Sequence, residues 1–254
     1  MAASVDLNAD MGESFGPWVM GRDAEILQVV TSANVACGFH GGDPGVMAET
    51  IRIASANGVG IGAHPGFPDL QGFGRRRMQM ATGDLQNAIR YQLGAIQGMA
   101  RSQGATVRHF KLHGALSNMC AEDEAMARAC YEAALSVDPD VIIFVLAATA
   151  QERAVTSLGC KWAGEIFADR AYNDDATLVD RSLPDAVIHD PAHAALRVVK
   201  MVQSDAIIAE SGAHIPARID TICLHGDNAA ALQIARTVRA GLETAGIALA
   251  PVGA

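Results

Sequence analysis

The sequence has few positive charges. Lysine occurs only at Lys111, Lys161 and Lys200, and the formal net charge of the 254 residues is −9. No basic stripe runs along the chain, although proteins that bind nucleic acid or acidic lipid surfaces carry one. We therefore expect neither a nucleic-acid partner nor a membrane partner. No apolar run is long enough to cross a bilayer, and the first residues enter a strand pattern rather than a leader peptide, so we expect a cytoplasmic protein.

The chain also lacks several familiar functional motifs. Its 5 cysteines are scattered without any C-x-x-C, which indicates neither a zinc knuckle nor a disulfide framework. No G-x-G-x-x-G follows the first strand pattern, and no G-x-x-x-x-G-K-[ST] occurs anywhere. The common loops that bind dinucleotides and nucleotide phosphates are therefore absent. No serine lies in a G-x-S-x-G turn, which disfavours an acyl-enzyme mechanism.

What the sequence does contain is an alternation of strand and helix patterns. We expect strands over residues 4–10, 34–40, 60–64, 107–113, 140–146, 161–167 and 221–225, and helices over 22–32, 44–57, 82–103, 122–136, 149–158, 190–203 and 229–245. Such alternation predicts a parallel sheet. Seven units without a linker favour one domain over residues 1–254. The predicted fold class is α/β, a distorted TIM-like (β/α) barrel of about seven parallel strands.

Strand alternation divides each strand into an apolar side and a polar side. In the first strand, Asp6, Asn8 and Asp10 oppose Val5 and Leu7. The polar sides of the later strands carry His40, His64, His109, Lys111, His113, His225 and Asp227. The apolar sides should face the helices, so the polar sides should face the barrel axis and its C-terminal mouth. Burying these groups together is costly unless they pair or serve a ligand, so we predict a catalytic mouth rather than a structural polar core.

Each candidate also has a structural interpretation. His40 and His64 could each close a loop, but their matching positions at the ends of consecutive strands favour a catalytic role. Lys111 could form a structural ion pair or orient a substrate carboxylate, and the sequence leaves both open. His109 and Asp6 lie deeper in their strands, and we expect them to be structural.

Two arginines and a set of metal-binding residue types extend the predicted site. Arg75 lies in a glycine-rich loop, residues 65–77, and Arg170 follows an aspartate. Each is either an ordinary ion-pairing residue or a clamp for an anion.

Histidine and aspartate at the mouth suit general acid–base attack by water on a carbonyl or phosphoryl centre. They equally suit a divalent metal held by Asp10, His40 and His64, so the metal content stays open.

Seven motifs then occur in a recognisable order. They are DLNADMGE (6–13), SANVACGFHGGD (32–43), IGAHPGFPD (61–69), FGRRRM (73–78), HFKLHG (109–114), FADRAY (167–172) and CLHGD (223–227). With them the chain resembles the LamB/YcsF family nearly end to end. The resemblance implies a barrel of the glycoside hydrolase/deacetylase type. It also implies ATP-dependent 5-oxoprolinase activity together with two partner subunits, in which the lactam of 5-oxo-L-proline is hydrolysed to L-glutamate while ATP is cleaved to ADP and phosphate.

Strand alternation, applied to this reaction, gives each candidate residue a hypothetical role. We expect His40 and His64, oriented by Asp10 and Asp227, to activate water or transfer protons. We expect Lys111 and His113 to stabilise the oxyanion. Substrate binding falls to Asn8, Glu13, Arg75, Arg170, His225 and Asp227. ATP is the expected cosubstrate, held largely by a partner chain because this one has no phosphate loop. The alternatives are a metal-dependent amide hydrolase of the polysaccharide-deacetylase type and a non-catalytic binding subunit.

Overall fold

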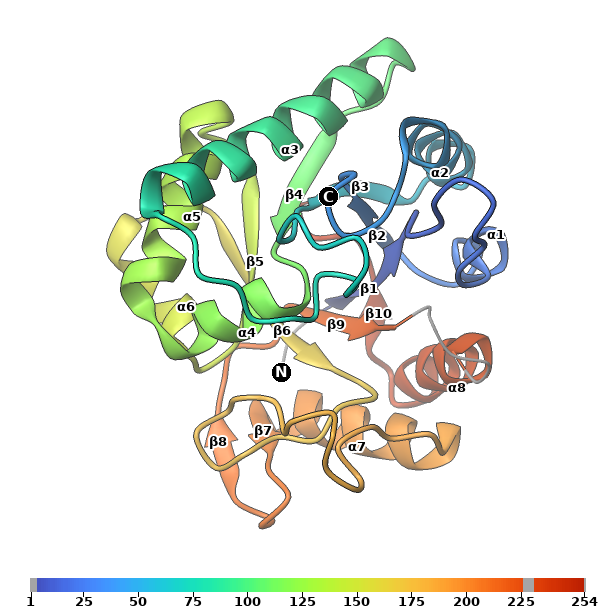
Figure 1. Ribbon diagram of the computed structural model, residues 1–254. Coiled ribbons are helices and arrows are strands. Elements are labelled where there is room, and N and C mark those ends of the chain that lie inside the picture. The colour runs from blue at the N-terminus through green and yellow to red at the C-terminus, as the bar shows by residue number, and fades with distance from the viewer. Residues whose placement is uncertain (1–3, 226–230, 254) are drawn as a thin grey trace.

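Figure 1 shows the computed structural model of the chain, which describes residues 4–225 and 231–253. Seven strands form its centre: β1 (Ser4–Met11), β2 (Ser32–Ala36), β3 (Gly60–His64), β4 (Val107–Lys111), β5 (Ile142–Leu146), β6 (Trp162–Phe167) and β9 (Thr221–Leu224). Each pairs in parallel with the next in this order. The ring closes because β9 also pairs in parallel with β1. The predicted barrel of about seven parallel strands is confirmed.

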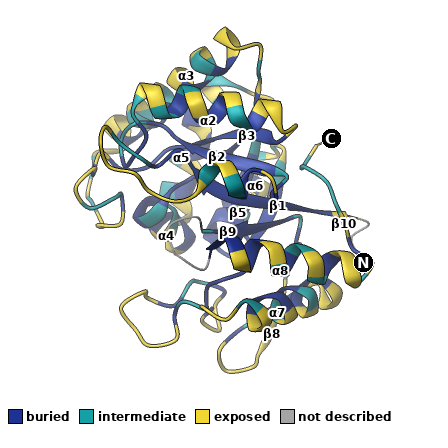
Figure 2. Ribbon diagram, turned by 90° about the vertical axis from the view of Figure 1, so that its right-hand side faces the viewer, coloured by how far each residue is buried: buried dark blue, intermediate teal, exposed yellow. Residues whose placement is uncertain are grey.

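Helices surround this barrel. They are α1 (Asp23–Ile26), α2 (Pro44–Ala56), α3 (Thr82–Ser102), α4 (Gly114–Glu122), α5 (Glu124–Val137), α6 (Ala150–Leu158), α7 (Pro191–Ser204) and α8 (Ala231–Thr244). Figure 2 shows buried strands inside and helices whose outer faces are exposed. The starts of α2 and α7 follow from the sequence, because Asp43 and Asp190 each accept hydrogen bonds from helix N–H groups ahead of a proline at the first helical position. Among the described residues, no helix combines the length and the apolar character needed to cross a bilayer.

Several predicted boundaries were wrong. The second strand ends at Ala36 rather than at residue 40, because Gly38 and Gly42 adopt φ of +94° and +78° and turn the chain out of the sheet. Gly42 also packs so tightly that a Cβ there would lie 2.5 Å from the carbonyl oxygen of Gly12. The fourth strand ends at Lys111, and α1 is much shorter than the predicted helix 22–32. His40 and His113 therefore lie in loops just beyond their strands.

Four short elements were not predicted. Helix α4 follows β4 directly, strands β7 (Ala206–Ile208) and β8 (His214–Pro216) form an antiparallel pair, and β10 (Ala248–Leu249) pairs with the start of β1. The three strands have two or three residues each, so they are too short to show a periodic pattern.

The division between apolar and polar strand faces is as predicted. Val5 and Leu7 are buried in the hydrophobic core around the barrel, whereas Asp6 accepts hydrogen bonds from hydroxyl groups of Thr31, Ser32 and Thr221. Burial raises the pKa of Asp6 despite these bonds. His109 is likewise structural. Its Nε2 lies 2.8 Å from Asn34 Oδ1, and its ring stacks on Phe144 with centroids 4.2 Å apart.

Candidate functional site

A cavity of about 480 Å³ opens at the C-terminal ends of the barrel strands. Its wall includes Asp10, Glu13, His64, Lys111 and His113, which come from the ends of β1, β3 and β4 or from the residues just beyond them. The carboxyl ends of parallel strands meet at one edge of a barrel, so residues distant in sequence become neighbours here. The structure thus brings four of the five predicted catalytic residues to one cavity, together with Glu13.

Lys111 lies in a network of buried polar groups at the floor of the cavity. Its Nζ lies 3.0 Å from Asp10 Oδ1, 2.9 Å from Glu165 Oε1 and 2.8 Å from Cys223 Sγ. Burial alone would lower the pKa of Lys111, but the charge on Asp10 and then on the other neighbours outweighs it and raises that pKa well above its usual value. The site therefore holds a permanent positive charge.

Asp10 joins this lysine to the nearest imidazole. Its Oδ2 lies 3.3 Å from His64 Nε2, and its Oδ1 accepts a hydrogen bond from Asn34 Nδ2. Burial would raise the pKa of Asp10, but His64 and Lys111 outweigh it and hold the pKa well below its usual value, so the group is a carboxylate. Asn8 lies one layer beneath, where its side chain bonds to Glu165 and to three other polar side chains. It supports the floor of the cavity and does not line it.

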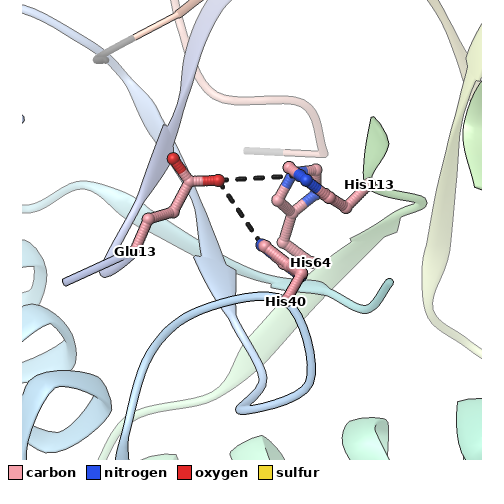
Figure 3. A group of neighbouring side chains, drawn as sticks. All are labelled: Glu13, His40, His64 and His113. Carbon is pink, nitrogen blue, oxygen red and sulfur yellow. Dashed lines mark hydrogen bonds and ion pairs between the residues drawn. The ribbon is translucent and has the colours of Figure 1, made fainter. Parts of the chain in front are cut away.

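Three imidazoles and a carboxylate meet beside Asp10. Figure 3 shows Glu13 facing His40, His64 and His113, and we call these four residues the histidine–glutamate cluster. His113 Nδ1 lies 2.9 Å from His64 Nε2, while Glu13 Oε1 lies 3.4 Å from His40 Nε2 and 3.6 Å from His113 Nδ1. One ligand atom from each residue lies within 4.8 Å of the others. The donor set could hold a metal ion, and it differs from the predicted set because Glu13 and His113 replace Asp10.

His40 lies deeper than predicted. It is fully buried and does not line the cavity, because its ring stacks under that of His113 with centroids 3.6 Å apart. The loop over residues 65–77 covers it, with the edge of Phe73 against both rings. Burial, reinforced by His64, lowers the pKa of His40 well below its usual value. Burial also lowers the pKa of His113, so both rings are neutral.

Glycine is required where this loop crosses the cluster. A Cβ at Gly74 would lie 2.7 Å from His113 Cδ2 and 2.8 Å from His40 Cβ, and Gly74 has a φ of +61°. A Cβ at Gly66 would lie 2.9 Å from His40 Nδ1. The buried side-chain amide of Gln92 accepts a hydrogen bond from the Gly66 backbone N–H and donates one to the Gly66 carbonyl oxygen. The glycine-rich composition of this loop thus reflects close packing over the imidazoles.

Arginines form another part of the cavity wall. Arg75, Arg170 and Arg181 all line it, and the guanidinium of Arg75 lies over the ring of Phe73. Burial, followed by the nearby charge of Arg181, lowers the pKa of Arg170 to about 10, which leaves its guanidinium charged at neutral pH. This wall suits an anionic group of a ligand.

Arg76 and Arg77 form ion pairs, whereas Arg170 in the wall is held by backbone carbonyl oxygens. Arg76 pairs with Asp69, and Arg77 pairs with Glu122 at the rim of the cavity. Arg170 donates hydrogen bonds to the carbonyl oxygens of Val179 and Ala186, 2.5 Å and 3.2 Å away. These backbone bonds fix the orientation of Arg170 at the wall.

Asp169 does not simply pair with the arginine that follows it in the sequence. His225 Nδ1 donates a hydrogen bond to Asp169 Oδ1 over 2.8 Å, and Arg181 donates to His225 Nε2 over 2.9 Å. Burial would raise the pKa of Asp169, but the neighbouring His225, which donates to it, and then the charges of Arg181 and Arg170 outweigh burial and leave that pKa below its usual value. His225 lines the cavity as predicted, whereas Asp227 lies outside the described residues.

Sequence reasoning missed three residues that shape the site. Glu165 on β6 pairs with Lys111, and strand alternation could have found it, because Glu165 shares a side of its strand with Ala163. Phe73 accepts a hydrogen bond from His113 Nε2 through its carbonyl oxygen, at a φ of +55°. Arg181 belongs to an irregular segment that has no periodic pattern to indicate its position.

Comparison with known proteins places this geometry in a family. The chain is 67% identical over 245 residues to the 5-oxoprolinase A subunit of Ruegeria pomeroyi, and the match covers 96% of this chain and 97% of that protein. A lactam utilization protein from Thermus thermophilus superposes with a TM-score of 0.91 at 42% identity, covering 97% of this chain and 99% of the other. A peptidoglycan N-acetylglucosamine deacetylase domain from Eubacterium rectale shares the fold, with a TM-score of 0.53 at 11% identity over 98% of this chain and 88% of the other. The LamB/YcsF family pattern matches residues 5–254, and the chain therefore belongs to the LamB/YcsF family.

Proposed function

We propose that this chain is the A subunit of a 5-oxoprolinase and that its barrel mouth opens the lactam ring of 5-oxo-L-proline. The relative at 67% identity carries that name, and the superposed structure is of a lactam utilization protein. The observation that carries the proposal is one cavity whose wall holds a charged lysine, a carboxylate–imidazole pair and several guanidinium groups. These groups match the carbonyl, the attacking water and the carboxylate of the substrate.

The hydrolysis needs a base for the water and a positive charge for the oxygen. His64 Nδ1 donates a hydrogen bond to the Lys111 carbonyl oxygen over 2.9 Å, so the lone pair of a neutral His64 is on Nε2, beside Asp10. In this proposal His64 Nε2 takes the proton of the attacking water, and the Lys111 ammonium stabilises the developing oxyanion. The proton then passes to the ring nitrogen of the lactam as the C–N bond breaks.

The substrate carboxylate would bind at the arginine wall. Arg75 and Arg170 both line the cavity, and a guanidinium can hold a carboxylate through two parallel hydrogen bonds. Arg170 is already oriented by its bonds to backbone carbonyl oxygens. We therefore assign orientation of the substrate to these two arginines, with His225 and Asp169 supporting the neighbouring Arg181.

We also propose that ATP is consumed together with two partner subunits. The sequence has no G-x-x-x-x-G-K-[ST] loop, so the partners would hold most of the nucleotide. Transfer of the γ-phosphoryl group to the lactam carbonyl oxygen would release ADP and activate the carbonyl carbon. Water would add to this carbon, and cleavage of the C–N bond with protonation of the nitrogen would open the ring to an acyl phosphate. A second water would then hydrolyse that acyl phosphate to glutamate and phosphate. We place this complex in the cytoplasm, where ATP is available.

Reconstitution tests the proposal. Glutamate formation from 5-oxoproline and ATP is measured with the chain, with its two partner subunits, and with the complete complex. We expect turnover only in the complete complex, and a loss of about 10²- to 10⁴-fold on His64→Ala. His193→Ala is the matched control, because His193 is an exposed histidine on α7. Wild-type turnover by a complex carrying His64→Ala would instead support a non-catalytic binding subunit.

The metal-dependent deacetylase alternative predicts a different substrate. Its support is the histidine–glutamate cluster, since the deacetylase likeness at 11% identity concerns the fold alone. Release of acetate from N-acetylated sugars by the chain alone, without ATP, would favour this alternative. We expect none, because the guanidinium groups in the wall suit an anionic substrate better than a neutral sugar.

A further inference from the structure

Two backbone carbonyl groups determine which ring nitrogens of the cluster carry protons. The carbonyl oxygen of Lys111 accepts from His64 Nδ1 over 2.9 Å, and that of Phe73 accepts from His113 Nε2 over 2.8 Å. A carbonyl oxygen can only accept, so both of these nitrogens carry hydrogen. When both rings are neutral, the lone pairs are therefore on His64 Nε2 and His113 Nδ1.

These two lone pairs point at each other. His64 Nε2 and His113 Nδ1 are 2.9 Å apart, and Asp10 Oδ2 lies 3.3 Å from the same His64 nitrogen. All three groups are buried. Three electron-rich atoms in contact repel one another in a buried site unless something positive lies between them. The arrangement thus requires either a shared proton or a cation.

His40 and Glu13 favour a cation over a single proton. Both ring nitrogens of His40 are buried and have no hydrogen-bond partner among the described residues. His40 Nε2 lies 3.4 Å from Glu13 Oε1, which lies 3.6 Å from His113 Nδ1. A proton shared between His64 and His113 leaves His40 unsatisfied. An ion at the centre of the cluster would contact Glu13, His64 and His113, and it would also contact His40 once that ring turns out of its stack on His113.

The spacing of the cluster matches a small transition-metal ion. Ligand atoms held about 2.0–2.1 Å from a four-coordinate zinc are about 3.4 Å from one another. Three of the six separations, 2.9, 3.4 and 3.6 Å, lie near this value, and all six lie within 4.8 Å. Three imidazole nitrogens and one carboxylate oxygen form a donor set that suits zinc and its neighbours rather than calcium or magnesium.

We propose that Glu13, His40, His64 and His113 bind one divalent transition-metal ion of the zinc type. The ion would lie between His113 Nδ1 and His64 Nε2 and would polarise a bound water or a carbonyl oxygen at the edge of the cavity. Gln92 and the glycines of the covering loop would keep the imidazoles in place. This inference does not depend on the substrate proposed above, but His64 Nε2 cannot bind the ion and also take a proton from water. With the ion bound, Asp10 Oδ2, which lies 3.3 Å from that nitrogen, would be the base instead.

A second group of potential ligands is a poorer site. Asp10, Cys223 and His225 also offer atoms within 4.8 Å of one another. The Lys111 ammonium already contacts Cys223 Sγ and Asp10 Oδ1, so a positive charge lies against two of the three. His225 uses Nδ1 to bond Asp169 and Nε2 to accept from Arg181, which leaves no ring nitrogen for a metal.

Zinc binding to the full chain is the direct test. The purified protein is stripped with a chelator, titrated with Zn²⁺ by calorimetry, and its bound metal is measured by mass spectrometry. We expect one equivalent of tightly bound zinc and a fall in affinity of at least about 100-fold for Glu13→Gln and for His113→Ala, since even outer-shell changes cost 10- to 100-fold. His193→Ala, which removes an exposed histidine on α7, should bind zinc like the wild type.

Diffraction gives a readout that does not depend on the variants. Crystals of the zinc-loaded protein should show an anomalous peak between the three imidazoles at the zinc absorption edge. Glu13→Gln keeps the shape of its side chain, and its thermal unfolding checks that a loss of zinc is not a loss of fold. The proposal is overturned if the wild type binds less than a tenth of an equivalent, if the zinc lies elsewhere, or if nuclear magnetic resonance finds a proton shared between His64 and His113 in the presence of zinc.

Discussion

The ammonium of Lys111 and the carboxylate of Asp10 form a buried ion pair at the floor of the cavity, with Nζ 3.0 Å from Oδ1. Their side chains are only 4% and 8% exposed, so water screens the pair weakly. Glu165 adds a second carboxylate 2.9 Å from the same nitrogen. Lys111 therefore both stabilises the barrel core and supplies the positive charge that the proposed reaction uses.

Replacing this lysine should destabilise the fold strongly. Lys111→Met leaves the buried carboxylates of Asp10 and Glu165 without their cation, which should lower the free energy of unfolding by about 3–5 kcal/mol. The matched control is Lys161→Met, because Lys161 pairs with Asp140 at the surface, where the side chains are 62% and 82% exposed. That change should cost less than about 1 kcal/mol in urea denaturation. Equal costs for the two variants would contradict the buried pair.

Strand alternation explains how much of this site could be predicted. It placed Asp10 and Lys111 on the axis side of their strands. Both side chains line the cavity at the barrel mouth, where they form an ion pair. It also assigned Asp6 and His109 to the interior as structural residues, where their hydrogen bonds lie. A covered parallel barrel has one consistent polar side, so a simple two-residue period was sufficient.

The part that could not be predicted depends on loop conformation. His40 was assigned to a strand side, but the strand ends four residues earlier and a loop with two left-handed glycines carries His40 beneath His113. The same limit applies to Phe73, whose φ of +55° is uncommon for a residue with a side chain. Arg181 reaches the cavity from an irregular segment, so its position is set by tertiary contacts that leave no local pattern.

The buried His109 should make stability depend on acidity. Burial and then the charge of Lys111 lower the pKa of His109 to about 3, whereas the unfolded chain has the ordinary value near 6.5. The unfolded state therefore binds one more proton below pH 6.5, and His109 should contribute on the order of 5 kcal/mol of stability that is lost as the pH falls from 6.5 toward 3. Above pH 6.5 this contribution is complete.

Urea denaturation across this pH range measures the effect. His109→Gln should reduce the slope of unfolding free energy against pH between 6 and 4 by about 1.4 kcal/mol per pH unit, which is one proton. The exposed His214 is the matched control, and His214→Gln should leave the slope unchanged. An unchanged slope in His109→Gln would show that His109 is protonated in the folded protein.

Gly62 should tolerate no side chain, because the ring of His109 lies directly over it. A Cβ at Gly62 would be 2.0 Å from His109 Nε2, and that ring is held by Asn34 and Phe144. Gly62→Ala should therefore cost at least about 1–3 kcal/mol of stability. Gly94→Ala on the exposed side of α3 has open space around it and should stabilise the protein by up to about 1 kcal/mol. Urea denaturation of both variants gives the sign of each change, and stabilisation by Gly62→Ala would contradict the packing described.

Arg75 should set substrate affinity more than turnover. Its guanidinium lines the cavity while the side chain is largely exposed, so Arg75→Met removes a charge from the wall without opening the core. Loss of a charge-assisted hydrogen bond to the substrate carboxylate, about 1.5–3 kcal/mol, should raise KM for 5-oxoproline about 10- to 100-fold in the reconstituted complex. Since the carboxylate does not change during ring opening, kcat should fall far less. Arg52→Met on α2, where Arg52 pairs with Glu49 at the surface, is the matched control and should leave KM unchanged. A wild-type KM in Arg75→Met would assign the substrate carboxylate to Arg170 instead, and Arg170→Lys would then have to raise KM.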